Sequence, residues 1–183
     1  MRRMVFFLMA CCILLALESG AQGAVRFHSI TQIGFLYGDT EKLPLLQSVN
    51  GIRYKRSSAG IGLGLDYYFT RSSTLFVHLQ QDVLSGSSSP FFYAAIGSAM
   101  PVEKKVENEL SRSEYERGLY YDLGIGYRCA VGEKLSLHFN LGYTRKEVHE
   151  TRWSRFNFPQ DEAQYFDYSF RRISFKLGLG WND

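Results

Sequence analysis

The sequence lacks long apolar runs, and it has little proline, cysteine or net charge. No stretch approaches the roughly 18 consecutive apolar residues that a membrane-spanning helix needs, which excludes a multi-helix membrane protein. The formal net charge of +3, from 21 basic and 18 acidic residues, does not favour a nucleic-acid binder. Aromatic residues make up 15% of the chain, so the composition is not that of a disordered protein. A length of 183 residues suits one domain.

The first 21 residues are predicted to be a signal peptide. Two arginines precede Val5–Leu17, a continuous apolar stretch of 13 residues, and small residues follow it. This order of charged, apolar and small residues is typical of an exported protein, with cleavage after Ala21 or after Gly23. With cleavage after Ala21, the domain comprises residues 22–183. Only Cys129 remains in it, so no intramolecular disulfide is expected.

Within this domain, apolar and polar residues alternate with a period of two, which is typical of β-strands. The clearest case is Leu119–Val131, in which every odd position is apolar or aromatic and most even positions are small or polar. Successive side chains of a strand point to opposite faces, so one face of this strand is apolar. The pattern predicts eight strands: Phe27–Tyr37, Leu46–Lys55, Gly60–Tyr67, Leu75–Val83, Phe91–Met100, Leu119–Val131, Leu135–Thr144 and Ile173–Trp181.

Three features indicate that the apolar faces point towards lipid rather than into a soluble barrel. Glycine is frequent on the opposite face, where it suits a crowded lumen. The connections also alternate in length, as they do in outer-membrane barrels. Short periplasmic turns are expected at Arg56–Ser58, Leu84–Pro90 and Gly132–Lys134. The loops on the other side are expected at Gly38–Leu45, Thr70–Ser73, Pro101–Gly118 and Arg145–Phe166.

The third feature is the position of aromatic residues near the strand ends. Amphipathic rings prefer the headgroup level of a bilayer, so two girdles are expected. The upper girdle comprises Tyr37, Tyr67, Tyr121 and Tyr143, and the lower girdle comprises Tyr54, Phe92, Tyr127 and Trp181. The alternative explanation is that tyrosine and phenylalanine simply favour strands.

Four segments resemble strands of small outer-membrane β-barrel proteins, a family numerous in Bacteroidetes. They are Ala59–Tyr68, Pro90–Gly97, Leu137–Arg145 and Arg172–Trp181. The likeness covers essentially all of residues 22–183, and the architecture is similar to the transmembrane barrel of outer-membrane protein A. The resemblance implies a monomer in the outer membrane of a Gram-negative bacterium, in contact with outer-membrane lipid and lipopolysaccharide. It also implies that the barrel-assembly machinery recognises the last strand.

These patterns predict an all-β fold, an eight-stranded antiparallel up-and-down transmembrane β-barrel. In lipid every backbone polar group must be paired, so the sheet must close. Eight strands enclose a lumen that side chains fill, which favours a plugged interior over an open pore. Charged residues of both signs are expected there in mutual pairs. They are Arg53, Asp66, Asp122, Arg128 and Lys176, accompanied by Gln32, His78, Asp82, His138 and Asn140.

No catalytic residue, cofactor site or metal site is predicted. The glycines of Gly60–Gly64 are spaced strictly by two within a strand, which does not fit the nucleotide-binding fingerprint. His28, His78 and His138 are expected in the lumen, without the closely spaced partner ligands of a zinc motif. Ser29 and His28 face opposite ways in their strand, so they do not form a nucleophile and base.

The last loop is the better candidate for a binding site. Its predicted anchors are Arg152, Trp153, Arg155, Phe156 and Phe158. Exposed tryptophan and arginine are typical binding anchors, and arginine also suits the phosphates of lipopolysaccharide. The alternative is that the last two strands extend beyond the membrane and these aromatic residues pack on each other. By contrast, the mixed charges of Pro101–Gly118 are typical of a solvated surface.

We therefore expect an outer-membrane protein with a structural or surface-interaction role, such as adhesion or ligand binding through its extracellular loops. The leading alternative is an enzyme that modifies lipid A, as an acyltransferase or a deacylase. A narrow, porin-like channel is the third hypothesis. No nucleic-acid partner is expected.

Overall fold

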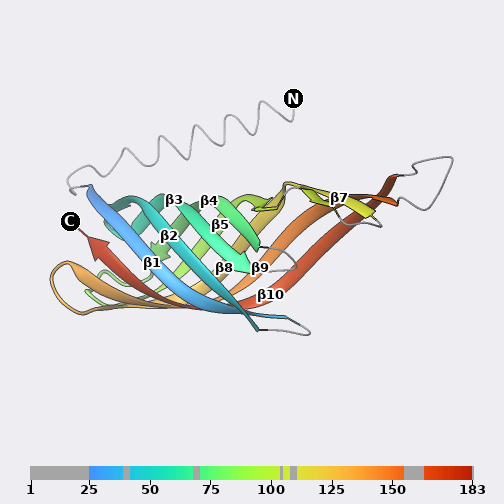
Figure 1. Ribbon diagram of the computed structural model, residues 1–183. Coiled ribbons are helices and arrows are strands. Elements are labelled where there is room, and N and C mark those ends of the chain that lie inside the picture. Colours follow the sequence, from blue (N-terminus) through green and yellow to red (C-terminus); the bar gives the residue numbers. More distant parts are fainter. Residues whose placement is uncertain are drawn as a thin grey trace, which may run out of the picture.

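The computed structural model describes residues 25–38, 42–67, 71–103, 105–107, 111–154 and 163–182. The predicted signal peptide with both cleavage sites lies outside these ranges, as do Arg155, Phe156 and Phe158. None of the described residues belongs to a helix long and apolar enough to cross a membrane. The strands (Figure 1) are β1 (Arg26–Tyr37), β2 (Lys42–Tyr54), β3 (Ser57–Tyr67), β4 (Arg71–Asp82), β5 (Ser89–Pro101), β6 (Lys105–Glu107), β7 (Ser111–Glu116), β8 (Gly118–Ala130), β9 (Leu135–Ser154) and β10 (Ala163–Asn182).

Eight of these strands form a closed barrel in the order β1-β2-β3-β4-β5-β8-β9-β10, each antiparallel to the next. β10 closes the barrel on β1, from Asn182 opposite His28 to Ile173 opposite Tyr37. Closure pairs the backbone polar groups that an open sheet would expose to lipid. The structure therefore confirms the predicted eight-stranded up-and-down barrel. We call the end that carries Arg26 and Asn182 the base, and the opposite end the rim.

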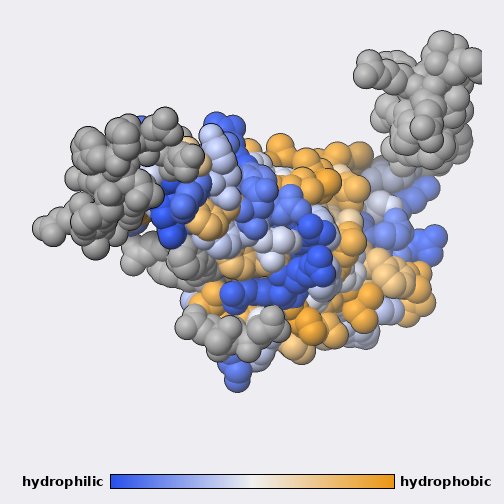
Figure 2. Space-filling model, turned by 90° about the vertical axis from the view of Figure 1, so that its right-hand side faces the viewer, coloured by the Kyte–Doolittle hydropathy of each residue, from blue (hydrophilic) through white to orange (hydrophobic). Residues whose placement is uncertain are grey.

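The barrel is polar inside and apolar outside. Along β3, the outward-facing Ile61 and Leu63 are 64% and 63% exposed, whereas the inward-facing Asp66 is 2% exposed. A water-soluble barrel has the opposite arrangement, since apolar side chains fill its interior. Seen from the rim end, hydrophobic residues gather on the flanks of the molecule (Figure 2). An apolar outer wall around a polar lumen is the pattern of a barrel that spans a membrane.

Two inward-facing glycines show why glycine suits this lumen. A Cβ atom on Gly62 would lie 2.2 Å from the Phe76 ring, and one on Gly142 would lie 2.0 Å from the Tyr93 hydroxyl. Both aromatic side chains are buried inside the barrel. Glycine in the wall therefore makes room for large rings in a narrow interior.

Beyond the rim, β9 and β10 continue as a paired ribbon. Their pairing is unbroken from the base to Ala163 opposite Trp153, ten residues past the level at which β1 ends. The prediction of a loop at Arg145–Phe166 is therefore wrong for its two arms, Arg145–Ser154 and Ala163–Phe166. The predicted strand ends at Thr144, where the apolar residues stop, but backbone pairing between the two arms holds them as strands. This arrangement matches the alternative in which the last two strands extend beyond the membrane.

Two short strands widen the ribbon into a sheet. β7 pairs with the end of β9, from Glu116 opposite His149 to Ser111 opposite Ser154, and β6 pairs with β7. The predicted loop Pro101–Gly118 therefore contains two strands rather than only a solvated loop. The order of strands beyond the rim is β10-β9-β7-β6, and we call this part the outer sheet.

The remaining connections are short. β2 begins at Lys42 and β4 begins at Arg71, so the rim loops predicted at Gly38–Leu45 and Thr70–Ser73 are shorter than expected. At the base, β2 passes into β3 through a two-residue turn in which Lys55 has a φ of 54°. A φ in this left-handed region is unfavourable for a residue that carries a side chain.

Candidate functional site

Three groups of ion pairs occupy the lumen between the base and the rim. In the group at the base, Asp82 of β4 accepts hydrogen bonds from Nε and Nη2 of Arg128 at 2.9 and 2.7 Å. Arg53 contacts the same carboxylate oxygen. Arg128 also donates to the carbonyl of Ser87, in the turn below, at 2.6 Å. One buried carboxylate therefore links β2, β4 and β8 across the lumen.

The middle group joins β5, β8 and β10. Nζ of Lys176 lies 2.5 Å from Oδ2 of Asp122, and the Tyr93 hydroxyl donates to Oδ1 of the same residue at 3.1 Å. The Lys176 ammonium also lies 4.5 Å from the centre of the Tyr93 ring. Beside this group, the Asn140 amide donates to Gln32 at 2.7 Å. All of these side chains are buried, and each charge has an opposite charge or an amide as its neighbour.

The third group lies near the rim. Nζ of Lys146 on β9 pairs with Asp66 of β3 at 2.7 Å, and Ser72 donates to the same carboxylate at 2.5 Å. Sequence reasoning missed Lys146 because it assigned this position to a loop. The period of two continues through Thr144, Lys146 and Val148, and this was the signal that could have placed the lysine on the inner face.

The charges in the lumen are paired with one another. Taking a charge out of water is costly unless an opposite charge and hydrogen bonds compensate for it. The rings of Phe76 and Tyr120, with centres 5.5 Å apart, add an apolar cluster inside the same barrel. The structure places all five predicted lumen charges inside: Arg53, Asp66, Asp122, Arg128 and Lys176.

Aromatic residues of both predicted girdles lie on the outer wall. Those at 38–60% exposure are Tyr37, Tyr143, Phe92, Tyr127 and Trp181. Tyr54 and Tyr121 are half-buried, and the side chain of Tyr67 lies outside the described part. Lysines approach these rings at both ends of the barrel, with Lys42 at 5.3 Å from the Tyr37 ring and Lys134 at 6.0 Å from the Trp181 ring. Rings flanked by cations suit the level at which lipid meets water.

On the outer sheet, a polar cluster is centred on Glu150. This buried carboxylate accepts hydrogen bonds from the Tyr168 hydroxyl and from Nε of Arg152, both at 3.0 Å. Burial acts to raise the pKa of Glu150, but hydrogen bonds from Ser113, Tyr168 and Arg152 outweigh it and hold the pKa below its ordinary value. The cluster therefore ties β7, β9 and β10 together beyond the barrel.

The two described anchors of the predicted binding site, Arg152 and Trp153, lie on opposite faces of β9 because they are consecutive in a strand. Arg152 lies 5.2 Å from the Phe166 ring, beside a stack of Phe166, Tyr168 and Phe170. Trp153 instead contacts Arg112 of β7, whose guanidinium is 5.7 Å from the indole. Sequence reasoning missed Tyr165, which is 79% exposed on the face that carries Trp153. Arg155, Phe156 and Phe158 lie outside the described residues.

Side chains that could support other chemistry are separated. His28 is buried in the lumen, whereas the neighbouring Ser29 donates to Asn50 on the other face at 2.8 Å. These two residues therefore do not form a nucleophile and base. Among the residues that the structure describes, no group of three or more His, Cys, Asp or Glu side chains is arranged to hold a metal ion.

No protein-family profile matches the sequence, and no curated protein matches it. The fold is similar to solved structures. The N-terminal β-barrel domain of Pseudomonas aeruginosa OprF gives a TM-score of 0.59 at 10% identity, over 88% of this chain and 100% of that one. Neisserial surface protein A gives 0.55 at 9% identity, over 86% and 96%. Outer membrane protein AlkL, solved in DMPC lipid bilayers, gives 0.52 at 10% identity, over 91% and 93%.

At such low identity these likenesses show the fold alone, which is that of a small outer-membrane β-barrel. The resemblance to the Bacteroidetes family stays a prediction.

Proposed function

We propose that the protein is a monomeric outer-membrane barrel that presents an interaction sheet outside the cell. The observation that carries this proposal is the unbroken pairing of β9 and β10, which runs ten residues beyond the end of β1. At about 3.4 Å per residue, the ribbon is about 34 Å long, measured along β10, beyond the end of β1. The apolar wall of the barrel is the anchor, and the outer sheet is the part that a partner meets.

The orientation follows from the connections. Both ends of the barrel sheet lie at the base, as they do on the periplasmic side of such barrels, whereas the segments that carry β6, β7 and the outer parts of β9 and β10 extend from the rim. The rim then faces outward among lipopolysaccharide, and the base faces the periplasm. By the resemblance, β10 is the strand that the barrel-assembly machinery recognises during insertion.

The tip of β10 supports a role in binding. β1 ends opposite Ile173, so none of the described strands pairs with Ala163–Asp167 on the side away from β9. An open strand edge is a template for backbone pairing with an extended segment of another protein. Tyr165, in the middle of this edge, is exposed and supplies an aromatic anchor. We place adhesion or ligand binding at this tip.

Removal of the tip tests the proposal. A variant with Asn-Gly in place of residues 149–167 retains every barrel strand and removes the open edge. Vesicles that carry the purified protein are tested for adhesion to bacterial and animal cells, and we expect the variant to lose adhesion. A variant with two extra residues inserted at Gly132, in a turn at the base, is the matched control. Equal adhesion by the tip variant and the control would refute the proposed binding tip.

The enzyme and channel hypotheses lack a supporting observation among the described residues. The paired charges of the lumen favour a closed interior, so planar-bilayer recordings should show no steady conductance. Lipid A mass spectra from cells with and without the protein should be identical, because His28 and Ser29 lie on opposite faces. A mass change equal to one acyl chain would revive the enzyme hypothesis.

A further inference from the structure

We infer that the outer wall formed by β1, β2, β9 and β10 binds lipid A, the phosphorylated acyl lipid of lipopolysaccharide, at one defined site. The inference rests on the proposed orientation, in which the rim faces outside. The site combines an apolar groove with three cations that lie above it, towards the rim.

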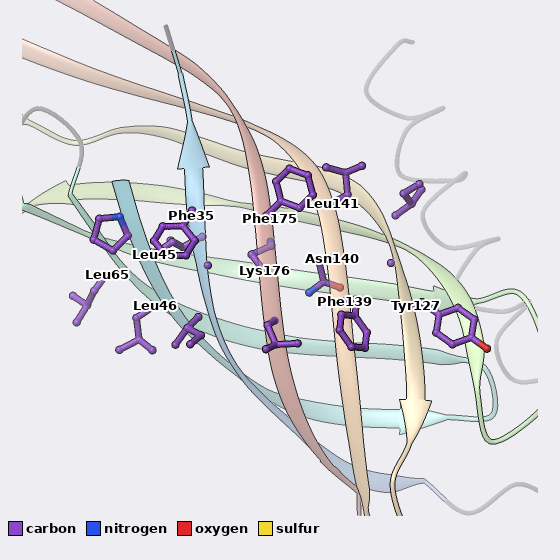
Figure 3. Close-up of a pocket in the computed structure, with 16 residues that line it drawn as sticks. Phe35, Leu45, Leu46, Leu65, Tyr127, Phe139, Asn140, Leu141, Phe175 and Lys176 are labelled. Atoms are coloured by element: carbon purple, nitrogen blue, oxygen red, sulfur yellow. The ribbon is translucent and has the colours of Figure 1, made fainter. Parts of the chain in front are cut away.

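The apolar part of the site is a groove of about 1160 Å³ on the outer wall. Phe35, Phe175 and Leu141 line it from β1, β10 and β9, where they are neighbours in the strand register (Figure 3). These three side chains are 41–55% exposed and face away from the lumen. The next row towards the base continues the apolar lining with Ile33, Leu177 and Phe139. Such a surface suits acyl chains that lie along the wall.

The cations lie on the same outer face. Arg171 and Arg145 are directly opposite each other on β10 and β9, four residues towards the rim from Phe175 and Leu141. Positions four apart in a strand share a face, so the guanidinium groups lie above the groove. Lys42, exposed at the start of β2, completes the group. The outer wall therefore carries an apolar groove and, next to it on the side towards the rim, a group of three cations.

The opposed arginines are the strongest indication of an anion. Like charges directly opposite each other on neighbouring strands are destabilising. Arg145 donates to Ser169 at 3.0 Å and pairs with Glu147 at 2.9 Å. Arg171 is exposed, and no described acidic residue forms an ion pair with it. Glu147 already compensates Arg145, so a phosphate beside Arg171 would supply the counter-charge that Arg171 lacks among the described residues, through charge-assisted hydrogen bonds.

The spacing of the cations favours lipid A over a phospholipid. Lys42, Arg171 and Arg145 span β2, β1, β10 and β9, which is three strand spacings or about 14 Å. A headgroup with one phosphate reaches only one end of this row. Lipid A carries two phosphates on a disaccharide, above several acyl chains, and therefore matches both the row of cations and the groove beneath it.

Native mass spectrometry of the full chain, released from detergent micelles, tests the site. Lipid A with both phosphates and phosphatidylglycerol are the two probes. We expect lipid A to form a one-to-one complex, and Arg171→Gln to weaken it about tenfold, because one charge-assisted contact with a phosphate is lost. Lys134→Gln removes a cation at the base and is the matched control, with no expected effect. Phosphatidylglycerol should bind more weakly and respond less to Arg171→Gln.

Equal binding of the two probes, or equal lipid A binding by Arg171→Gln and Lys134→Gln, would overturn the inference. Gel mobility before and after boiling verifies that each variant is folded. A labelling experiment distinguishes a wrong orientation of the barrel from a wrong lipid site. Arg171→Cys, in a Cys129→Ser background, is treated on intact cells with a membrane-impermeant thiol reagent. An unlabelled variant would show that the rim does not face outside, which refutes the proposed function. If the variant is labelled but the protein with Arg171 binds lipid A and phosphatidylglycerol equally, only the lipid site is refuted.

Discussion

The outward faces of the same two strands, β9 and β10, carry different residues below and above the rim. In the barrel half, Phe139 and Leu141 face outward and are exposed, while the intervening Asn140 is buried. In the outer sheet, Nδ1 of His149 lies 2.6 Å from a carboxylate oxygen of Asp167, with both side chains exposed on the outward face, while Val148 is buried on the other face. The alternation of exposed and buried side chains continues without a break, but the outward face changes from uniformly apolar to mixed polar and aromatic.

This difference shows that a period of two indicates a strand, whereas the residue types on its outward face depend on whether lipid or water surrounds it. Lipid selects apolar side chains on the outside of the barrel half, and water selects charged side chains on the same face beyond it. The same kind of substitution should therefore have different effects in the barrel and in the outer sheet.

The largest effect is expected inside the barrel. Asp82→Ala leaves Arg53 and Arg128 buried without their shared carboxylate, so the free energy of unfolding should fall by about 3–5 kcal/mol. Urea titration of the protein in lipid vesicles measures this value. Glu114→Ala, which removes a partly exposed partner of Lys105 and Arg112 on the outer sheet, is the control and should cause little loss. Equal losses in the two variants would contradict the distinction between the regions.

A charge on the outward face should have opposite consequences in the two regions. Ile61→Arg places a guanidinium in the middle of the apolar wall, at a cost of about 2–4 kcal/mol in lipid. Tyr165→Arg places the same group on the outward face of the outer sheet, where water solvates it, and should cost almost nothing. The same unfolding titration compares the two variants. If Ile61→Arg is as stable as Tyr165→Arg, the outer wall does not face lipid.

The outer sheet should loosen in acid while the barrel stays intact. Hydrogen bonds hold the pKa of Glu150 below its ordinary value of 4.5, so this carboxylate stabilises the fold above that pH. The stabilisation is lost as the pH falls below about 4.5 and the group takes up a proton. Protection factors from amide hydrogen exchange around Val148–Thr151 should therefore drop between pH 7 and pH 3.5. In Glu150→Gln this drop should be absent, and its persistence would assign the effect to another group.

The smallest expected effect lies in a turn at the base. Lys55→Gly relieves the left-handed backbone at φ of 54° and should raise the free energy of unfolding by about 0.5 kcal/mol. Arg56→Gly, at the next position of the same turn, relieves no such strain and should lower the stability instead. Thermal unfolding of both variants in one detergent compares them, and a loss of stability in Lys55→Gly would show that the turn is not strained.

The barrel could be predicted from the sequence because lipid imposes one rule on every strand. Leu119–Val131 was predicted as a strand, and β8 spans Gly118–Ala130. The outer sheet could not be predicted in the same way, since the charges after Thr144 end the apolar period. A period of two continues through Val148, but the strand is held by its pairing with β10 and β7, and the sequence alone does not show which strands pair.

For the lumen, too, the residue types could be predicted from the sequence, whereas their pairing could not. The residue types of the inner face follow from the alternation, so charges such as Asp122 and Lys176 could be placed inside from the sequence. Which charges meet could not, because partners such as Asp66 and Lys146 come from strands 80 residues apart. Similarly, arginine and tryptophan identified Arg152 and Trp153 as anchors, but only the strand geometry separates them onto two faces.

The electrophoretic mobility of the outer-membrane fraction, before and after boiling, tests most directly the claim that the apolar wall faces lipid. A closed barrel whose backbone is fully paired resists detergent, so the unboiled protein should be found in this fraction and migrate differently from the boiled one. Recovery from the soluble periplasm, with one mobility under both conditions, would contradict the account and turn the apolar faces towards the inside of a soluble barrel.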